Sequence, residues 1–358
     1  MLPSKVANLG DIFTGRLLSE IPTALSSLLT ALLELPSLHT VNLNDNAFGL
    51  NMQAPLVAFL SSHVPLRHLY LNNNGLGPHA GILVADALST LHEKKEAARK
   101  EGKDVPNLET VICGRNRLEA GSMLAWAKCY SLHTGMKTVR MVQNGIRTEG
   151  TVHLIKDGLK HCSGLRVLDL QDNLFTIAGA KALAESIPHW PEVEEIGASD
   201  TLWGSKGIQH VCKAFQKGKN QKLHTLRMQY DDINAKGLAT LLETAKSSLP
   251  ALRKVELNGN KFSEDDISVI GLKDLLEERK EKLAGDVVVE DDWGLDELDE
   301  LESDDEDEDE SEEEEEEAEE VKEKLIEAQE EAQEEPTVQV KDKEVDDLAD
   351  ALAKKATV

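Results

Sequence analysis

The sequence predicts an α/β solenoid in which short parallel strands alternate with helices. One frame of apolar residues recurs eight times along the 358-residue chain, and the residues after each copy have the apolar spacing of a helix. A unit of this size cannot bury its apolar face alone. Stacked copies therefore form one curved array, with strands on the concave face and helices on the convex face.

The clearest copy is LRHLYLNNNGLG, residues 66–77, which reads as a strand and a tight asparagine-rich turn. Leu66, Leu69, Leu71 and Asn74 match L-x-x-L-x-L-x-x-N, the signature of a leucine-rich repeat. Successive copies lie 28 to 30 residues apart, except for one interval of 42 that contains the charged segment EKKEAARKEGKDVPN near residues 93–107. The first apolar positions of the copies are Leu38, Leu66, Leu108, Met136, Leu165, Val193, Leu223 and Leu252.

The eighth residue after each of these positions is asparagine in six of the eight copies. A buried amide needs hydrogen-bond partners, so we interpret these asparagines as a structural ladder that satisfies backbone groups where the chain leaves each strand. The ladder consists of Asn46, Asn74, Asn116, Asn144, Asn173 and Asn260. The other two copies have Thr201 and Asp231 at this position.

Further elements flank the repeats. A weak strand, Val6 to Leu9, and a helix, Ile21 to Leu35, are expected before the first clear copy, and a capping helix, Ser263 to Lys282, after the last. We divide the chain into a leucine-rich-repeat domain (1–285), an acidic disordered tail (286–320) and a charged C-terminal segment (321–358) that can form a short helix.

The charge is concentrated near the C-terminus. Between Glu290 and Glu320 there are 23 acidic residues and no Lys or Arg, whereas residues 1–289 are nearly neutral. Like charges in a run repel each other, which predicts disorder and a preference for basic protein surfaces over nucleic acid and anionic membranes. The alternative is a tail that serves solubility alone. Ser303 and Ser311 precede acidic runs and resemble acidophilic kinase sites.

Several classes of chemistry have no support in the sequence. The four cysteines form no C-x-x-C pair, the eleven histidines have no metal-ligand spacing, and no apolar run approaches the ~18 residues of a membrane span. There is no G-x-x-x-x-G-K-[ST] and no G-x-S-x-G. We therefore expect no metal and no active site for a small substrate. A catalytic role would have to be lent to the active site of a partner.

Seven motifs resemble the GTPase-activating proteins of the small GTPase Ran, in their fungal form. They are DIFTGR (11–16), LNDNAFG (43–49), LYLNNNGLGP (69–78), ICGRNRLE (112–119), MVQNGI (141–146), VLDLQDN (167–173) and VELNGN (255–260). The resemblance covers about residues 6–320. Relatives carry roughly two further repeats before the TGR loop, so we expect the N-terminal repeats to be missing from this chain.

The resemblance implies a cytoplasmic protein that binds Ran in its GTP form, with or without a Ran-binding protein, and stimulates GTP hydrolysis. GTP and Mg²⁺ are then held by Ran, and this chain needs no cofactor. The alternative is a leucine-rich-repeat scaffold or inhibitor that binds a partner without any effect on catalysis.

The resemblance also assigns roles to residues. The family's catalytic asparagine, after the L-Y-L strand, matches Asn73, and its TGR-loop arginine matches Arg16. In the family the asparagine helps to hold the GTPase's own glutamine, which orients the attacking water, and no arginine finger enters. The residues alone favour a second turn asparagine for Asn73, and they leave Arg16 open between a surface arginine after a turn glycine and an arginine finger or orienting arginine.

Successive repeats present one continuous surface along their strand-exit turns. Polar residues there are expected to contact the partner, the alternative being that each is simply solvated. These residues are Asp45, Asn72, Arg115, Arg117, Gln143 and Asp172.

Overall fold

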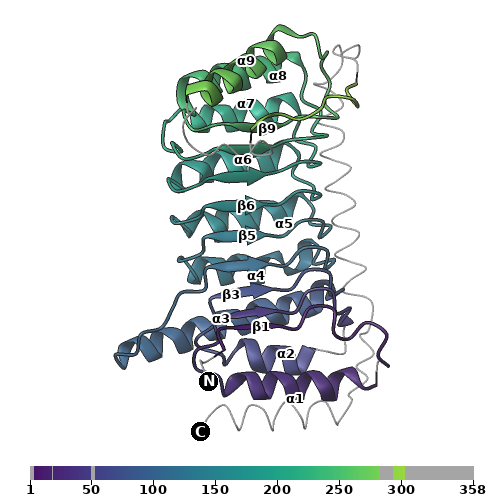
Figure 1. Ribbon diagram of the computed structural model, residues 1–358, viewed down its shortest axis with the longest axis vertical. Helices are drawn as coiled ribbons and strands as arrows, with labels where there is room; N and C mark the ends of the chain where they lie inside the picture. Colours follow the sequence, from purple (N-terminus) through teal and green to yellow (C-terminus); the bar gives the residue numbers. More distant parts are fainter. Residues whose placement is uncertain (1–3, 18, 50–52, 283–292, 303–358) are drawn as a thin grey trace.

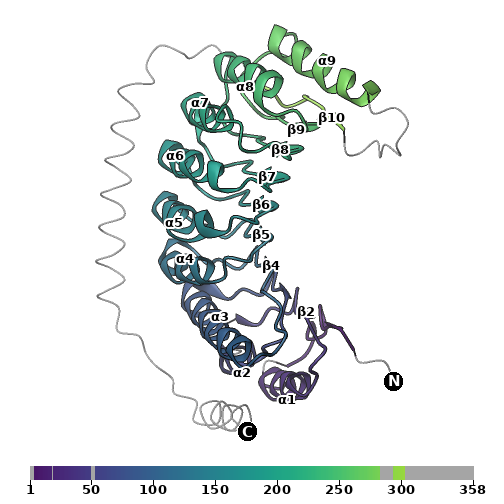
Figure 2. The ribbon, with the colours of Figure 1, turned by 90° about the vertical axis from the view of Figure 1, so that its left-hand side faces the viewer.

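The computed structural model describes residues 4–17, 19–49, 53–282 and 293–302. These residues form one parallel sheet of ten strands, whose order in the sheet is their order in the chain. Figure 1 shows the strands stacked along the long axis of the molecule. In the perpendicular view the stack is a crescent, with the strands along its concave side and the helices along its convex side (Figure 2). The predicted curved α/β solenoid is therefore confirmed.

Each strand is short because the chain turns at once into the asparagine-rich exit. The strands are β1 (Val6–Asn8), β2 (Thr40–Asn42), β3 (His68–Tyr70), β4 (Thr110–Ile112), β5 (Thr138–Arg140), β6 (Val167–Asp169), β7 (Glu195–Gly197), β8 (Thr225–Arg227), β9 (Lys254–Glu256) and β10 (Gly294–Leu295). From β2 to β9 the middle residues are in register and point into the core, at most 2% exposed. This column of aliphatic side chains joins the repeats into one cooperative core.

The convex layer follows the predicted pattern of one helical segment after each strand exit. Its helices are α1 (Ile21–Leu33), α2 (Gln53–Leu60), α3 (Gly77–Lys100), α4 (Met123–Leu132), α5 (Thr148–His153), α6 (Thr176–Ser186), α7 (Gly204–Phe215), α8 (Ala235–Ser248) and α9 (Ile267–Lys282). The first helix ends two residues before the predicted Leu35, and the last begins four residues after the predicted Ser263. The apolar residue two positions after each ladder position, such as Phe48 or Trp203, is buried between the two layers.

The long interval between the second and third copies is explained by α3, whose last turns extend beyond the neighbouring helices (Figure 1). The side chain of Lys95 folds back and is only 1% exposed. Its Nζ donates to the carbonyl oxygens of Val64, Leu66 and Pro106 at 2.6, 2.7 and 2.9 Å. Burial lowers the pKa of Lys95 to about 7, but three carbonyl acceptors match the three N–H groups of the charged ammonium. The inserted residues are thereby tied to the backbone that leads into β3.

The asparagines at the ladder positions are all buried, at most 4% exposed. The amide of Asn74 is typical: its Nδ2 donates to the carbonyls of Leu43 and Leu71, both at 3.0 Å, and its Oδ1 accepts from Asn46 N at 3.1 Å. Each amide thus links its own repeat to the preceding one. A ladder of this kind satisfies backbone groups that the tight turns leave without sheet partners.

The C-terminal boundary of the fold differs from the prediction. The sequence predicts that residues 293–302 belong to the acidic disordered tail, but β10 pairs with β9 and the residues after it continue along the last repeat. Asp296 accepts from Leu257 N at 2.7 Å and from Asn258 N at 3.0 Å. Leu295, Leu298 and Leu301 pack against the core. The acidic composition of this segment predicted disorder wrongly, because the Asp296 carboxylate binds backbone N–H groups and the leucines between the acidic residues pack against the core. Residues 286–292, 303–320 and 321–358 lie outside the described residues.

Candidate functional site

The strand-exit turns create a row of residues at one edge of the sheet, each immediately before a ladder position except Asp11, which follows β1 and precedes Ile12. Their backbones are left-handed, with φ between 54° and 61°, a region that asparagine, aspartate and glycine tolerate best. We call this row the rim. It consists of Asp11, Asp45, Asn73, Arg115, Gln143, Asp172, Asp200 and Tyr230. The rim therefore includes the catalytic candidate Asn73 and four of the predicted partner-contact residues.

Asn73 and its neighbour Asn74 have opposite environments. The side chain of Asn74 is 0% exposed, whereas Asn73 is exposed to solvent. The Asn73 backbone N donates to Gly114 O at 2.9 Å, and its side-chain Nδ2 donates to Asp45 Oδ1 at 3.0 Å. The turn thus buries one amide for the ladder and presents the other, held by a carboxylate, to whatever approaches the rim.

Asn72 is less available than the sequence suggested. It is half-buried, and its Oδ1 accepts from Gly114 N at 2.6 Å while its own N donates to Asn44 Oδ1 at 2.8 Å. A second, shorter row of amides therefore runs beside the main ladder at this end of the sheet. The asparagines of LNDN and LNNN were the sequence signal for this second row. The sequence did not show in which direction each amide points.

Arg16 lies in the loop that follows β1. Gly15 makes the turn with φ 81°, and Arg16 N donates to Phe13 O at 3.0 Å. The base of the loop is fixed because Asn46 Oδ1 accepts from Phe13 N at 3.2 Å. The exposed arginine lines a shallow groove of about 430 Å³ between this loop and α1.

Arg16 and Asn73 belong to the same edge of the sheet, since both follow the carboxyl ends of parallel strands. Their strands, β1 and β3, are separated only by β2, and neighbouring strands lie ~4.8 Å apart. The fold therefore brings the two catalytic candidates to one edge of the sheet, on two loops that are separated by the loop after β2.

The charge along the rim changes sign. Arg115 and Arg117 are exposed on the repeat next to Asn73, followed by exposed Gln143. Further along, Asp172 is half-buried, and its pKa is raised by burial and then by a hydrogen bond with Asp200. The sequence prediction had omitted Asp200 and Tyr230, because their copies lack the asparagine that marks the turn elsewhere.

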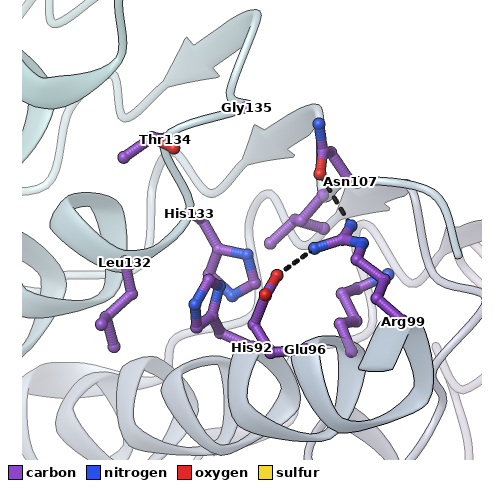
Figure 3. A pocket seen from close by; sticks show the side chains of 10 residues that line it. His92, Glu96, Arg99, Asn107, Leu132, His133, Thr134 and Gly135 are labelled. Carbon is purple, nitrogen blue, oxygen red and sulfur yellow. Dashed lines mark hydrogen bonds and ion pairs between the residues drawn. The ribbon is translucent and has the colours of Figure 1, made fainter. Parts of the chain in front are cut away.

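A separate cavity of about 200 Å³ lies at the opposite edge of the sheet, where the chain enters the strands. Figure 3 shows Arg99 between Glu96 and Asn107, with His92 beside His133. Arg99 forms an ion pair with Glu96 and donates to Asn107 Oδ1 at 2.7 Å and to Val105 O at 3.1 Å. These contacts secure the end of α3, so we assign the cavity a structural role and place the candidate functional site on the rim.

Among the described residues, no group of three or more His, Cys, Asp or Glu is arranged to hold a metal ion. No helix in the same part of the chain is long and apolar enough to cross a membrane. The rim itself presents amide, carboxylate and guanidinium groups, which can form hydrogen bonds and ion pairs with another protein.

The stacked strands, the convex helices and the buried asparagine ladder define a leucine-rich-repeat protein. Within this class, the chain is 41% identical over 262 residues to "Ran GTPase-activating protein 1" of Saccharomyces cerevisiae, covering 72% of this chain and 63% of the yeast protein. It is 34% identical over 258 residues to "Ran GTPase-activating protein" of Drosophila melanogaster, covering 71% of this chain and 42% of the fly protein. The chain is thus a homologue of the Ran GTPase-activating proteins, as its motifs predicted, and it spans less than two thirds of the length of these relatives.

No protein-family model matches the chain. Among solved structures, the leucine-rich repeat-containing protein LegL7 from Legionella pneumophila superposes with a TM-score of 0.37 at 12% sequence identity. That superposition covers 79% of this chain and 91% of the LegL7 chain.

Proposed function

We propose that this protein stimulates GTP hydrolysis by the small GTPase Ran and that it does so by lending groups to Ran's active site. The observation that carries the proposal is the placement of Asn73: it is an exposed amide on the rim, in the motif by which the chain resembles its Ran GTPase-activating relatives. Arg16, on the loop after β1, would supply a second polar group at the same edge of the sheet.

In this proposal the protein is an activator and not itself an enzyme. GTP and Mg²⁺ belong to the partner, and the chain requires no cofactor of its own. The absence of a P-loop motif from the sequence supports this division of roles. The partner would be the GTP form of Ran, with or without a Ran-binding protein, encountered in the cytoplasm.

The energy that such an activator must supply is large. Acceleration by about 10⁵-fold lowers the barrier by about 7 kcal/mol. In this proposal the protein supplies no metal, base or nucleophile, and it acts by positioning the GTPase's glutamine and by excluding water from the site. Asn73 would hold that glutamine, which in turn orients the attacking water. Arg16 would orient the interface, and its replacement by Ala should lower activity.

The rest of the rim would provide affinity and orientation. The residues predicted to contact the partner lie on the rim or beside it and would together form one contact surface; they are Asp45, Asn72, Arg115, Arg117, Gln143 and Asp172. The 23 acidic residues between Glu290 and Glu320 would attract a basic surface on the partner, which raises the association rate more than the affinity.

Single-turnover phosphate release from Ran·GTP, with and without the full chain, tests the proposal. We expect acceleration by several orders of magnitude that saturates with protein concentration. A scaffold or inhibitor would bind Ran·GTP and leave the rate of hydrolysis unchanged, which would refute the activator role.

A further inference from the structure

The amide of Asn73 has a fixed orientation because of its contact with Asp45. The Nδ2 atom of Asn73 lies 3.0 Å from Asp45 Oδ1, and the two residues occupy the same rim position in adjacent repeats. A carboxylate only accepts hydrogen bonds, so the nitrogen of the Asn73 amide must face it. The amide oxygen, on the other side of the same planar group, therefore faces away from Asp45.

The backbone keeps the two side chains in reach of each other. Asp45 N donates to Asn72 O and Asn73 N donates to Gly114 O, both at 2.9 Å. The residues that follow them, Asn46 and Asn74, are ladder residues with exposed fractions of 1% and 0%. Both rim residues are thus anchored on rigid turns, and only their side chains extend into solvent.

This orientation has a chemical consequence for the proposed function. A glutamine that orients the attacking water must use its carbonyl oxygen to accept a hydrogen bond from that water. Its NH₂ group remains for a supporting residue, which must then be an acceptor. An asparagine can present either its oxygen or its nitrogen, but only the oxygen suits this task.

We propose that Asp45 is a positioning residue: it engages the nitrogen of Asn73 so that the Asn73 oxygen accepts from the NH₂ group of the partner's glutamine. The inference rests on the proposed function and deepens it. It replaces the sequence-based assignment of Asp45 as a direct partner contact with an action through Asn73.

The test compares two substitutions that both tolerate the left-handed backbone at this position. Asp45→Gly removes the acceptor, whereas Asp45→Asn keeps an oxygen that Asn73 can donate to. The readouts are the maximal rate of Ran·GTP hydrolysis and the half-saturating concentration of the full-length variant. We expect Asp45→Gly to lower the maximal rate about tenfold with a change of less than about twofold in half-saturation. Asp45→Asn should restore most of that rate.

A double-mutant cycle completes the test. In the Asn73→Ala background, Asp45→Gly should cause no further loss, because the residue on which it acts is gone. An additive loss, an equal loss for Gly and Asn at position 45, or a raised half-saturation at an unchanged maximal rate would overturn the positioning role. In those outcomes Asn73→Ala would still impair hydrolysis. Wild-type hydrolysis by Asn73→Ala would instead overturn the proposed role of Asn73 together with that of Asp45.

Discussion

Asp231 accepts two hydrogen bonds from Thr201 through one carboxyl oxygen, from the backbone N–H and from the hydroxyl, both at 2.8 Å. It stands at a ladder position where six other repeats have asparagine. Its second oxygen, Oδ2, is buried without a hydrogen-bond partner among the described residues. In Asn260 the corresponding place is filled by Nδ2, which donates to Leu257 O at 2.7 Å. An ionised carboxylate is therefore a poor substitute for an amide here.

Asp231→Asn should stabilise the protein at neutral pH by about 1 kcal/mol or more, because it replaces a buried acceptor with the donor that the ladder uses. Burial raises the pKa of Asp231 well above its ordinary value. The folded state therefore binds the Asp231 proton more tightly than the unfolded state does. This proton binding contributes to the free energy of unfolding fully below about pH 3.9, and the contribution is lost as the pH rises.

Melting temperatures of Asp231→Asn and the wild type at pH 4 and pH 8 would check this prediction. The advantage of the variant should be larger at pH 8. A variant that melts below the wild type at pH 8 would show that Asp231 is better accommodated than its unpaired oxygen suggests.

Acid should destabilise the fold through two buried histidines. His63 Nε2 contacts Leu38 O at 2.7 Å, and His133 Nε2 contacts Leu88 O at 2.8 Å, so each neutral ring donates to a carbonyl. Burial lowers the pKa of both to about 4. Unfolded histidine binds a proton near pH 6.5, so the stability is complete above that value and is lost as the pH falls toward 4. The loss is up to about 3 kcal/mol per histidine.

His63→Gln isolates one of these groups, since glutamine keeps an N–H donor but does not titrate. The drop in melting temperature between pH 7 and pH 5 should be smaller in this variant than in the wild type. An unchanged drop would mean that His63 does not contribute to the acid sensitivity.

The acidic strand β10 should be part of the stable fold. A chain ending at residue 285 lacks the contacts of Asp296 with Leu257 and Asn258, and also the cation–π contact in which Arg253 lies 5.8 Å from the Trp293 ring. Buried N–H groups would lose their acceptors, and the edge of β9 would be uncovered. We expect the melting temperature to fall by several degrees relative to a chain ending at residue 302. Identical melting curves for the two truncated chains would show that β10 adds no stability.

The repeat frame predicted the features that follow from periodicity, namely the core and the ladder. It did not predict side-chain orientations or the structure of the acidic segment after the last repeat. Leucines at alternate strand positions and asparagines at fixed offsets were sufficient to place the core and the ladder. They could not reveal the bond between Asp45 and Asn73, because spacing shows that two residues share a rim but not which way an amide points. The strand β10 was hidden by its charge, although Trp293 and Leu295 among the acids were a signal of packing.

Asn74→Ala should lower stability by about 1–3 kcal/mol, because it leaves the buried N–H of Asn46 without its acceptor and removes one of the two amide donors to the carbonyl oxygens of Leu43 and Leu71. Chemical denaturation would measure this loss. Asn46→Ala is a matched comparison in the preceding repeat and should give a loss of similar size, since its amide binds Leu9 and Leu43 in the same way. Unaltered stability in both variants would contradict the ladder.

Asn73→Ala should have the opposite profile to Asn74→Ala. Its side chain is exposed and donates to Asp45, so its loss should cost only about 1 kcal/mol of stability, chiefly the strain of alanine in a left-handed backbone. If the amide positions the GTPase's glutamine in the transition state, removing it should reduce the maximal rate of Ran·GTP hydrolysis by at least about 100-fold, the usual effect of deleting one transition-state contact. Binding of Ran·GTP should remain within about threefold, because most of the rim is unchanged.

Titration of the activator against Ran·GTP, with a separate binding measurement, distinguishes the two effects. If Asn73→Ala reaches half-saturation at the wild-type concentration while the maximal rate of GTP hydrolysis by Ran stays low, that result would support a role of Asn73 in the chemical step. The contrary outcome is specific: wild-type hydrolysis by Asn73→Ala, together with loss of stimulation by a folded Asn74→Ala, would mean that the buried amide is the functional one. Asn74 is buried like the other five ladder asparagines, and a partner could reach its amide only by opening the turn, which argues against that outcome.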